Sequence, residues 1–286
     1  MKQILVDTIL MSEKRKNIIM LLYDKGKMNI DEIKIALNVN SRAVMPQIKK
    51  LIGLNFIIQE KDAYELSDIG KIIVEKMQDL LNISSIFEEN PDYWKNRDLS
   101  KIPEHLLKRI GELGHCSLLE HDRYHLFEYH PVFIEEIFES NYLMMVSSSF
   151  QPQTLSILCD AAEKGMDISY IITKPLLERL IEDCQIDLEK YLTYDNTELL
   201  IDHEDDDIGL LTLAVSDKFI TIWLFDKKHK FNRTTLISYN ESALQWGKEL
   251  FVYYKDLAKP FDMHNRKYSF THESNHIMQN MGNSFS

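Results

Sequence analysis

The sequence predicts an α+β protein in which a small helical domain with a β-hairpin precedes a larger α/β domain. Three short amphipathic helices and two short strands fill most of residues 1–80, and strands alternate with helices through much of the remainder. Charge divides the chain at the same place. Residues 1–80 carry a net charge of +2, whereas the whole chain of 286 residues carries −12, so the remainder carries −14. Such a shift indicates a domain boundary.

The composition is typical of a globular protein. Hydrophobic residues make up 44% of the chain and charged residues 27%, which is enough for two modest cores. Cys116, Cys159 and Cys184 are odd in number and widely spaced, which argues against a disulfide framework and favours a reducing compartment. No apolar run reaches the roughly 18 residues that span a bilayer, and Asp7 interrupts the apolar stretch at the N-terminus. We therefore expect a cytoplasmic protein with no membrane partner.

Capping residues and apolar spacing place the elements of the first domain. Ser12 and Asn29 are plausible helix caps, and Gly26 follows the end of the first helix. The expected elements are helices at about 12–25, 31–37, 42–52 and 69–81 and strands at 56–60 and 64–66. Pro46 falls within the third helix, where a proline lacks a donor and clashes with the preceding turn. This helix is therefore expected to start late, near Val44, or to be kinked.

Three helices followed by a hairpin form a winged helix-turn-helix, whose third helix enters the major groove of DNA. Arg and Gln can read base edges, and Lys more often contacts phosphate. The candidate DNA-binding residues are Ser41, Arg42, Gln47, Lys49 and Lys50 on the third helix and Lys61 at the tip of the hairpin. Double-stranded DNA is thus the predicted partner. The alternative is a three-helix module that contacts other proteins.

A net charge of +2 is a weak electrostatic footprint for a DNA-binding domain. One copy is expected to bind weakly, so two copies reading two half-sites are favoured. The sequence therefore predicts a homodimer, held together by the helix at 69–88 and by the second domain. The more DNA binding relies on phosphate contacts, the more strongly its affinity should fall as the salt concentration rises.

The acidic region reads as a mixed sheet with helices on its faces. The expected elements are helices at 102–119 (broken near Gly111 and Gly114), 121–140 (kinked at Pro131), 153–164, 175–183 and 241–258, strands at 142–146, 167–173 and 198–201, and a hairpin formed by 208–215 and 219–225. Past Pro260 the chain turns polar and loses its apolar period. We expect three regions: a winged-helix domain with a linker helix at 1–85, an α/β sensor and dimerisation domain at 86–262, and a disordered tail at 263–286.

Several segments resemble one family of transcription factors. These are VSSSFQPQ, GMDISYIITKPLLERL, LAVSDKFITIWLF and ALQWGKELFVYYKDLA in the second domain, and SRAVMPQIKKL with YELSDIG in the first. They are similar to archaeal winged-helix regulators with a methanogenesis-regulatory middle domain. The resemblance implies a DNA-binding transcriptional regulator whose sensor domain is similar in layout to one half of a phospholipase-D-like fold. The turn at 226–232, DKKHKFN, departs from the family, whose members usually have a glycine and an acid there.

A small-molecule effector would bind beyond the carboxyl ends of the parallel strands, as ligands do in α/β sheets. This rule nominates Ser147, Ser148, Ser149 and Phe150 after the first strand and Thr173 and Lys174 after the second. The serines could donate to an anionic or hydroxylated ligand, and the lysine could supply charge. The alternative is a serine-rich turn whose hydroxyls only satisfy its own backbone.

No catalytic, metal or cofactor site is predicted. A phosphodiesterase of the phospholipase-D type needs His-x-Lys, which does not occur in the chain, so this enzymatic alternative is disfavoured. The sequence His272-Glu273-x-x-His276 matches a zinc-protease motif but lies in the polar tail, and we interpret it as a chance match. His121, His125 and His130 near Cys116 are spaced for a metal but are expected to be packing residues. The acidic run at 202–207 is expected to be a solvated loop.

Overall fold

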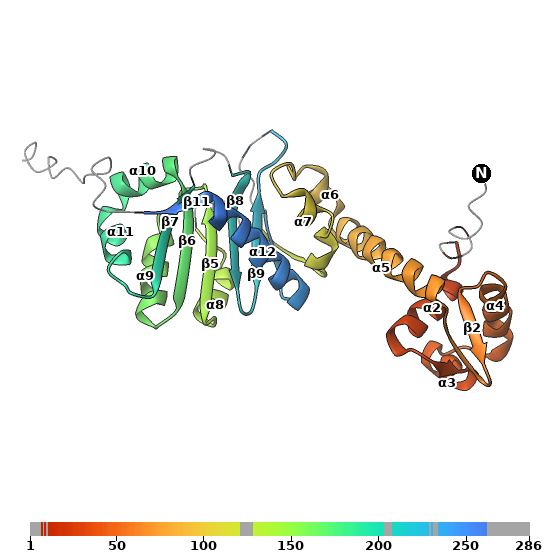
Figure 1. Cartoon of the computed structure of the whole chain (residues 1–286). Coiled ribbons are helices and arrows are strands. Elements are labelled where there is room, and N and C mark those ends of the chain that lie inside the picture. Colours follow the sequence, from red (N-terminus) through yellow and green to blue (C-terminus); the bar gives the residue numbers. More distant parts are fainter. Residues whose placement is uncertain are drawn as a thin grey trace, which may run out of the picture. The chain divides into compact units, whose positions relative to one another are not determined.

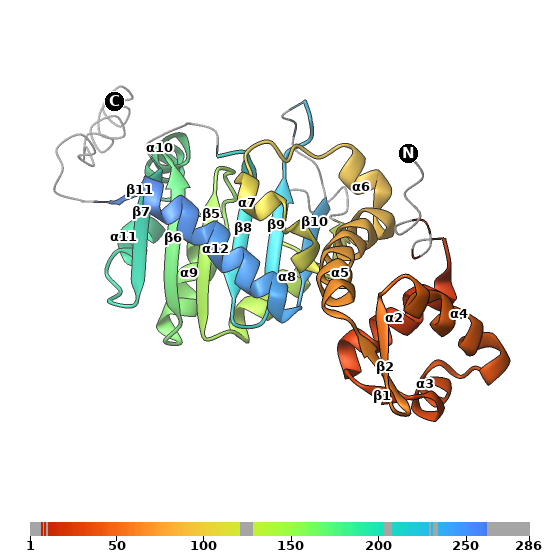
Figure 2. The same cartoon turned by 45° about the vertical axis from the view of Figure 1, so that its right-hand side comes forward.

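The computed structural model describes Asp7, Ile9 and residues 11–120, 128–202, 208–228, 230 and 234–261. The chain forms two compact units, residues 1–82 and residues 83–286 (Figures 1 and 2). No helix among the described residues is both long enough and apolar enough to span a bilayer. The tail at 263–286, with its His272-Glu273-x-x-His276 motif, lies outside the described residues, as do His121, His125 and residues 203–207.

The N-terminal unit is a winged helix-turn-helix. Its elements are α2 (Glu13–Lys25), β1 (Met28–Asn29), α3 (Ile30–Leu37), α4 (Ser41–Gly53), β2 (Ile57–Glu60), β3 (Ala63–Leu66) and the first part of α5 (Asp68–Glu89). The side chain of Ser12 caps α2, Asn29 forms a capping box with Glu32 on α3, and Asn40 caps α4. These local hydrogen bonds define where each helix begins.

A single hydrophobic cluster holds this unit together. Ile19, Ile33, Ile48, Leu51 and Phe56 are fully buried within it. The antiparallel sheet has the strand order β1-β3-β2. The two-residue strand β1 pairs with β3 but has no pattern of its own, and it was not predicted.

The start of α5 is fixed against the turn that leads from α4 into β2. The hydroxyl of Ser67 donates to the carbonyl of Asn55 at 2.5 Å and accepts the N–H of Gly70 at 2.9 Å. A side chain at Gly70 would place its Cβ 2.2 Å from the carbonyl oxygen of Phe56, so only glycine permits this approach. The predicted helix after Ser67 is confirmed, and it extends to Glu89.

Pro46 lies inside α4, which begins at Ser41. The expectation of a late start near Val44 is therefore wrong. The cap formed by Asn40, which accepts the N–H of Ala43 at 3.0 Å, starts the helix before the proline is reached. Because proline has no N–H, the carbonyl of Arg42 lacks its usual donor four residues later.

The C-terminal unit is built on an eight-stranded sheet with the order β11-β7-β6-β5-β8-β9-β10-β4. Its strands are β4 (Ser117–Glu120), β5 (Tyr142–Ser147), β6 (Asp167–Thr173), β7 (Thr197–Asp202), β8 (Leu210–Ser216), β9 (Ile220–Leu224), β10 (Thr234–Ser238) and β11 (Ala258–Pro260). β5, β6 and β7 are parallel, and the pairings from β5 through β8 to β9 are antiparallel. The carboxyl end of β9 therefore lies at the same edge of the sheet as those of the parallel strands.

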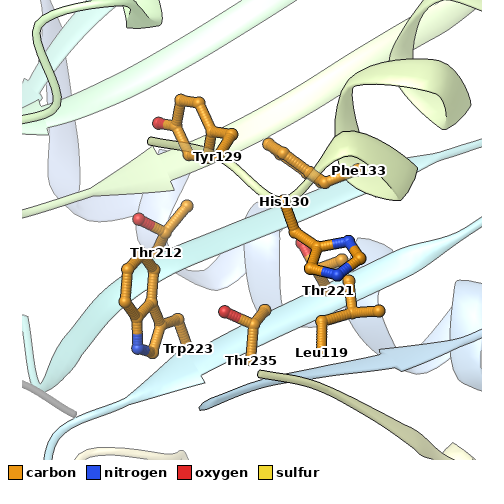
Figure 3. A pocket seen from close by; sticks show the side chains of 8 residues that line it. All are labelled: Leu119, Tyr129, His130, Phe133, Thr212, Thr221, Trp223 and Thr235. Atoms are coloured by element: carbon orange, nitrogen blue, oxygen red, sulfur yellow. The ribbon is translucent and has the colours of Figure 1, made fainter. Parts of the chain in front are cut away.

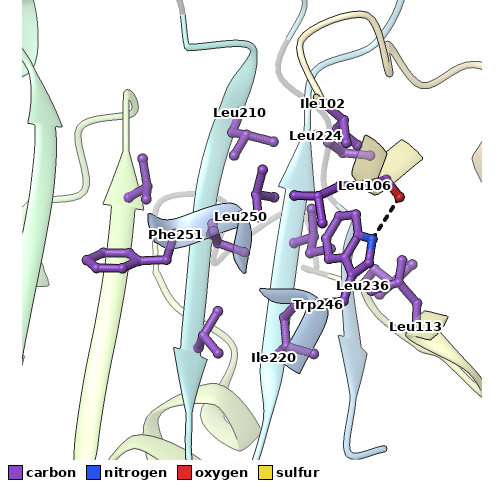
Figure 4. Packing of buried hydrophobic residues seen from close by; sticks show 14 of the residues in the cluster. Ile102, Leu106, Leu113, Leu210, Ile220, Leu224, Leu236, Trp246, Leu250 and Phe251 are labelled. Atoms are coloured by element: carbon purple, nitrogen blue, oxygen red, sulfur yellow. Dashed lines mark hydrogen bonds between the residues drawn. The ribbon is translucent and has the colours of Figure 1, made fainter. Parts of the chain in front are cut away.

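Helices cover both faces of this sheet (Figure 1). They are α6 (Pro91–Lys95), α7 (Glu104–Leu107), η1 (Ile110–Leu113), α8 (Pro131–Phe138), α9 (Thr154–Glu163), α10 (Lys174–Asp183), α11 (Gln185–Tyr191) and α12 (Glu241–Leu257). One core cluster lies under α12, α7 and η1, and the other lies under α8 to α11. In the first, Trp246 is fully buried and donates its indole N–H to the carbonyl of Leu106 at 2.9 Å (Figure 4).

The predicted strands at the centre of the sheet are confirmed, but several outer elements are not as predicted. The expected helix over 102–119 is α7, η1 and then β4, because Gly114 adopts φ 59° and turns the chain into a strand. The expected helix over 121–140 is α8, which begins at Pro131 after His130, while 121–127 lie outside the described residues. β10, β11 and α11 were not predicted.

Candidate nucleic-acid interface and ligand pocket

The outward face of α4 is rich in cations. Its solvent-exposed residues are Ser41, Arg42, Pro46, Lys49 and Lys50. The apolar positions of the same helix pack into the core, so this face cannot turn inward. Among the described residues, no carboxylate lies within ion-pair distance of Arg42, Lys49 or Lys50. Their charges are therefore available to phosphate groups.

Gln47 lies on the flank of α4 and faces α2. Its side-chain oxygen accepts a hydrogen bond from Nη1 of Arg15 at 2.9 Å, and the residue is half-buried. The amide oxygen of Gln47 is thus engaged within the domain. The structure does not bring Gln47 onto the same face as Arg42 and Lys49.

The tip of the hairpin between β2 and β3 is less basic than α4. Lys61 has φ 56°, in the left-handed region, and its carbonyl accepts a hydrogen bond from Gln59 at 3.0 Å. Lys27 pairs with Glu60 at 2.5 Å, and this hydrogen bond raises the pKa of Lys27 and lowers that of Glu60. Both groups are charged at neutral pH, and their opposite charges offset each other. At the tip itself, Lys61 lies next to Asp62 in the chain, so the hairpin offers little net positive charge.

The serine turn, defined as Ser147, Ser148 and Ser149, is bonded to the neighbouring strand β8. Ser147 Oγ donates to the carbonyl of Leu211 at 3.1 Å, and Ser149 Oγ donates to the same carbonyl at 3.2 Å. Ser148 Oγ donates to the carbonyl of Leu210 at 2.5 Å. Each hydroxyl therefore already donates its proton to a hydrogen bond within the protein. These contacts favour the alternative in which the turn satisfies the backbone.

The other predicted ligand residues lie close to the same edge of the sheet. Ser147 is paired with Ile172, the residue before Thr173, in the register of β5 and β6. Thr173 is buried, whereas Lys174 is exposed and its Nζ lies 3.9 Å from a carboxylate oxygen of Glu178. Phe150 lies under the guanidinium of Arg179, whose Cζ is 5.4 Å from the ring centroid. A role for these residues in ligand binding stays a prediction.

A pocket that the sequence did not reveal lies on the sheet beside α8 (Figure 3). It is lined by Leu119, Tyr129, His130, Phe133, Thr212, Thr221, Trp223 and Thr235. It has about 290 Å³ of empty space, part of which is open solvent. Thr212 connects it to the serine turn, because its hydroxyl lies 3.2 Å from Ser147 Oγ and 3.4 Å from Ser149 Oγ. The hydroxyls of Thr221 and Thr235 have no hydrogen-bond partner among the described residues.

Two of the polar side chains in this pocket already make hydrogen bonds within the protein. Tyr129 shares a hydrogen bond of 2.8 Å with Thr154, and burial raises the pKa of Tyr129 to about 12. Nδ1 of His130 accepts the N–H of Val132 at 3.3 Å, so in the neutral ring Nε2 carries the proton. The rest of the lining combines three threonine hydroxyls with apolar and aromatic side chains. It suits a small uncharged molecule that can both donate and accept hydrogen bonds.

The sequence gives only weak indications that these residues line a pocket. Thr221 and Trp223 are two apart in a strand, so they share a face, but the same spacing is common in any buried strand. Thr235 belongs to β10, which was not predicted. Tyr129 and His130 precede α8 and reach the pocket only because the chain crosses the sheet there.

The three thiols give no sign of redox or metal chemistry. Burial raises the pKa of Cys116 to about 12 and that of Cys159 to about 11, and it also raises that of Cys184. Thiols of this kind stay protonated and react slowly. Within the described residues there is no group of three or more His, Cys, Asp or Glu side chains placed to hold a metal ion.

Two family models match the chain, one on each unit. Residues 5–85 match the N-terminal domain of the methanogenesis regulatory protein FilR1, and residues 126–257 match its middle domain. The chain is similar to the methanogenesis regulatory protein FilR1 of Methanothrix harundinacea (strain 6Ac), with 24% identity over 263 residues. The match covers 88% of this chain and 56% of the relative, so the chain spans just over half the length of that protein.

Solved structures are more distant. TrmBL2, an archaeal chromatin protein with a novel mode of DNA binding, is 17% identical with a TM-score of 0.40, over 91% of this chain and 98% of its own. The phospholipase D family member Nuc from Salmonella typhimurium is 11% identical with a TM-score of 0.38, over 51% of this chain and 99% of its own. TM-scores below 0.5 carry no argument about function.

Proposed function

We propose that this chain, which belongs to the family of methanogenesis regulatory proteins of the FilR1 type, is a sequence-specific DNA-binding transcriptional regulator. The observation that carries this proposal is the outward face of α4. Arg42, Lys49 and Lys50 are exposed on it, and none has an acidic partner among the described residues. A helix-turn-helix reads DNA with its second helix in the major groove, and α4 occupies that position after α3.

The residues of α4 divide the work by chemistry. Arg42, in the first turn, is placed to reach base edges, because the N-terminal residues of a recognition helix contact them. Lys49 and Lys50 are placed to contact phosphate. The amide nitrogen of Gln47 remains for a contact while its oxygen is held by Arg15. Lys61 would make at most a peripheral phosphate contact.

The test is binding of the full chain to duplex fragments selected from the source genome, measured by fluorescence anisotropy. Arg42→Ala and Lys50→Ala should each weaken binding by about tenfold, which corresponds to about 1.4 kcal/mol. Lys108→Ala is the matched control, because it removes the same charge from a side chain of the C-terminal unit that is already paired with Glu104 at 2.6 Å. Wild-type affinity in both α4 variants would show that α4 does not read DNA.

We propose further that two copies associate through α5. Ile69, Ile72 and Leu80 are exposed on one side of this helix, and Ile72 keeps 64% of its surface accessible. Lys76 lies on the same stripe, as polar residues do in coiled-coil seams that fix register. Because the N-terminal residues 1–80 carry a net charge of only +2, pairing two copies should raise the affinity for DNA.

Sedimentation of full-length variants tests this association. Leu80→Asp in the α5 stripe should convert a dimer to a monomer at micromolar concentration. Ile35→Asp on α3 is the matched control, since Ile35 is 80% exposed and lies away from the stripe. If Leu80→Asp sediments like the wild type, α5 is not the dimer interface.

A small uncharged effector bound in the pocket beside α8 is the regulatory part of the proposal. Such a ligand would act by binding one conformation more tightly than another. The competing interpretation is a phosphodiesterase of phospholipase-D type. Turnover of a chromogenic phosphodiester by the wild type but not by His229→Ala would establish that activity and displace a purely regulatory role.

A further inference from the structure

The strongest unexplained feature of the C-terminal unit is a buried arginine without a counter-ion. Arg97 is only 8% exposed, and no carboxylate among the described residues lies within ion-pair distance of it. Its Cζ lies 4.3 Å from the centroid of the Tyr93 ring, and its Nε has no hydrogen-bond partner. A charge buried in this way is costly unless something pairs with it.

Two further hydrogen-bond donors belong to residues a few positions before Arg97 on the chain. The hydroxyl of Tyr93 and the indole N–H of Trp94 are buried and have no partner of hydrogen-bond geometry among the described residues, although Arg97 lies close enough to the Tyr93 hydroxyl to affect its pKa. The two rings meet edge to face at 5.1 Å. Burial raises the pKa of Tyr93 well above its usual value, and the charge of Arg97 only partly opposes this, so the phenol keeps its proton. Native proteins rarely leave three neighbouring buried polar groups unpaired.

The carboxylate of Asp226, in the loop after β9, already accepts hydrogen bonds from that loop. The carboxylate of Asp226 accepts the N–H groups of Lys228 at 2.8 Å and Lys230 at 2.7 Å, which lowers the pKa of Asp226. The main chain of Asp226 forms an isolated bridge with that of Arg97. The charge of Arg97 also helps to lower the pKa of Asp226, but the two side chains form no ion pair, so the main contribution of Asp226 is to position the loop beside Arg97.

The surroundings are basic although the unit as a whole is acidic. Lys227, Lys228 and Lys230 are exposed on the loop that follows β9, and the N–H of Lys227 donates to the carbonyl of Asn96 at 2.9 Å. The loop leaves the sheet at the carboxyl end of β9, next to α6 (Figure 1). This is the edge at which α/β sheets bind ligands.

We propose that Arg97, Tyr93 and Trp94 bind a small oxyanion, the carboxylate or phosphate group of a metabolite. An acceptor-rich ligand would pair with the unpaired donors of these side chains, and a guanidinium pairs best with a planar or tetrahedral oxyanion. The exposed lysines of the loop would attract the anion before it reaches Arg97. The phosphates of a DNA backbone cannot reach so deeply buried a side chain, which separates this site from the DNA-binding face.

The test is titration of the full chain, without DNA, with sodium phosphate and separately with sodium acetate at constant ionic strength. The chain has three tryptophans, so the indole N–H region of a ¹⁵N–¹H spectrum contains three assignable resonances. The Trp94 resonance, identified by its loss in Trp94→Phe, should move at millimolar anion while those of Trp223 and Trp246 stay. Movement with phosphate alone would indicate a phosphorylated ligand, and movement with acetate alone a carboxylate.

Variants give an independent readout. Arg97→Gln should weaken anion binding at least tenfold, and Arg97→Lys should retain part of it. Arg179→Gln is the matched control, since Arg179 is exposed and paired with Asp183 at 2.6 Å. Absence of a Trp94 shift with either anion, equal movement of all three indoles, or wild-type binding by Arg97→Gln would overturn the proposal. Should Arg97→Gln fail to fold, the wild-type spectra still decide.

Discussion

Each unit contains an arginine that forms no ion pair among the described residues, but one arginine is exposed and the other is buried. Arg42 in the N-terminal unit is exposed on α4, where water solvates its charge at little cost. Arg97 in the C-terminal unit lies inside, stacked on Tyr93, where its charge is costly until an anion arrives. Accessibility thus separates two classes of partner. A surface cation can reach a polymer of phosphates, whereas a buried one selects a small ion.

The cores of the two units differ as well. One cluster supports the N-terminal unit, while two clusters flank the sheet of the C-terminal unit. If the units are independent, a core substitution in one should leave the other unchanged.

The largest effect is expected in the core under α12. Trp246→Ala should lower the free energy of unfolding of the C-terminal unit by about 3–5 kcal/mol, because it leaves a cavity and removes the indole hydrogen bond to the carbonyl of Leu106. Calorimetry should show one transition moving down while that of the N-terminal unit stays. Tyr253→Ala, at a partly exposed position of the same helix, is the control and should cost far less. A joint shift of both transitions would mean that the units unfold together.

A second substitution should act on the N-terminal unit alone. Pro46→Ala restores a helical N–H to α4 and removes a steric clash, so it should raise the stability of this unit by about 1–3 kcal/mol. Pro91→Ala is the control, because a proline in the first turn of α6 displaces no hydrogen bond. Thermal denaturation followed by circular dichroism measures both. A lower transition temperature in Pro46→Ala would show that the proline is accommodated without strain.

The surface cations should also control how salt weakens DNA binding. Each of Lys49→Ala and Lys50→Ala should reduce the slope of log K against log salt by about 1. Anisotropy titrations across a salt series measure this slope. The same slope is expected for Arg97→Gln and the wild type, and a reduced slope in that variant would place Arg97 at the DNA surface.

The smallest expected effect is the pH dependence of the thiols, which all lie in the C-terminal unit. The pKa values of Cys116 and Cys159 rise from 9.0 to about 12 and about 11 on folding. The unfolded chain therefore loses these protons first, and the stability of the C-terminal unit should fall as pH rises above about 9. Urea unfolding at about pH 8 and 10 tests this, and Cys116→Ala should flatten the trend. An N-terminal unit that weakens equally would point to other groups.

The sequence predicted most of what depends on local patterns. Capping residues at Ser12 and Asn29, the alternation of β3 and the strand–helix order from β5 to β9 all have signatures a few residues long. β4 and β10 did not, because their residues become a strand only when they pair with each other far along the chain. Pairing between distant segments leaves little trace in either segment alone.

The candidate sites divide in the same way. The outward face of α4 could be predicted from helical spacing, and the position of the serine turn at the carboxyl end of β5 could be predicted from the apolar run before it. Whether a hydroxyl is free could not be predicted, since it depends on the carbonyls of Leu210 and Leu211 in another strand. The cluster around Arg97 was missed for this reason too, because an arginine is read as a surface residue until its burial is known.

Pro46 also changes what α4 can recognise. Arginine and lysine side chains only donate hydrogen bonds, so a face built from them pairs best with the acceptors of guanine and of phosphate. Pro46 adds an exposed apolar ring, without a donor or an acceptor, among these side chains. Such a ring can contact the methyl group of thymine in the major groove. The operator should therefore combine guanine acceptors with a thymine methyl group opposite α4.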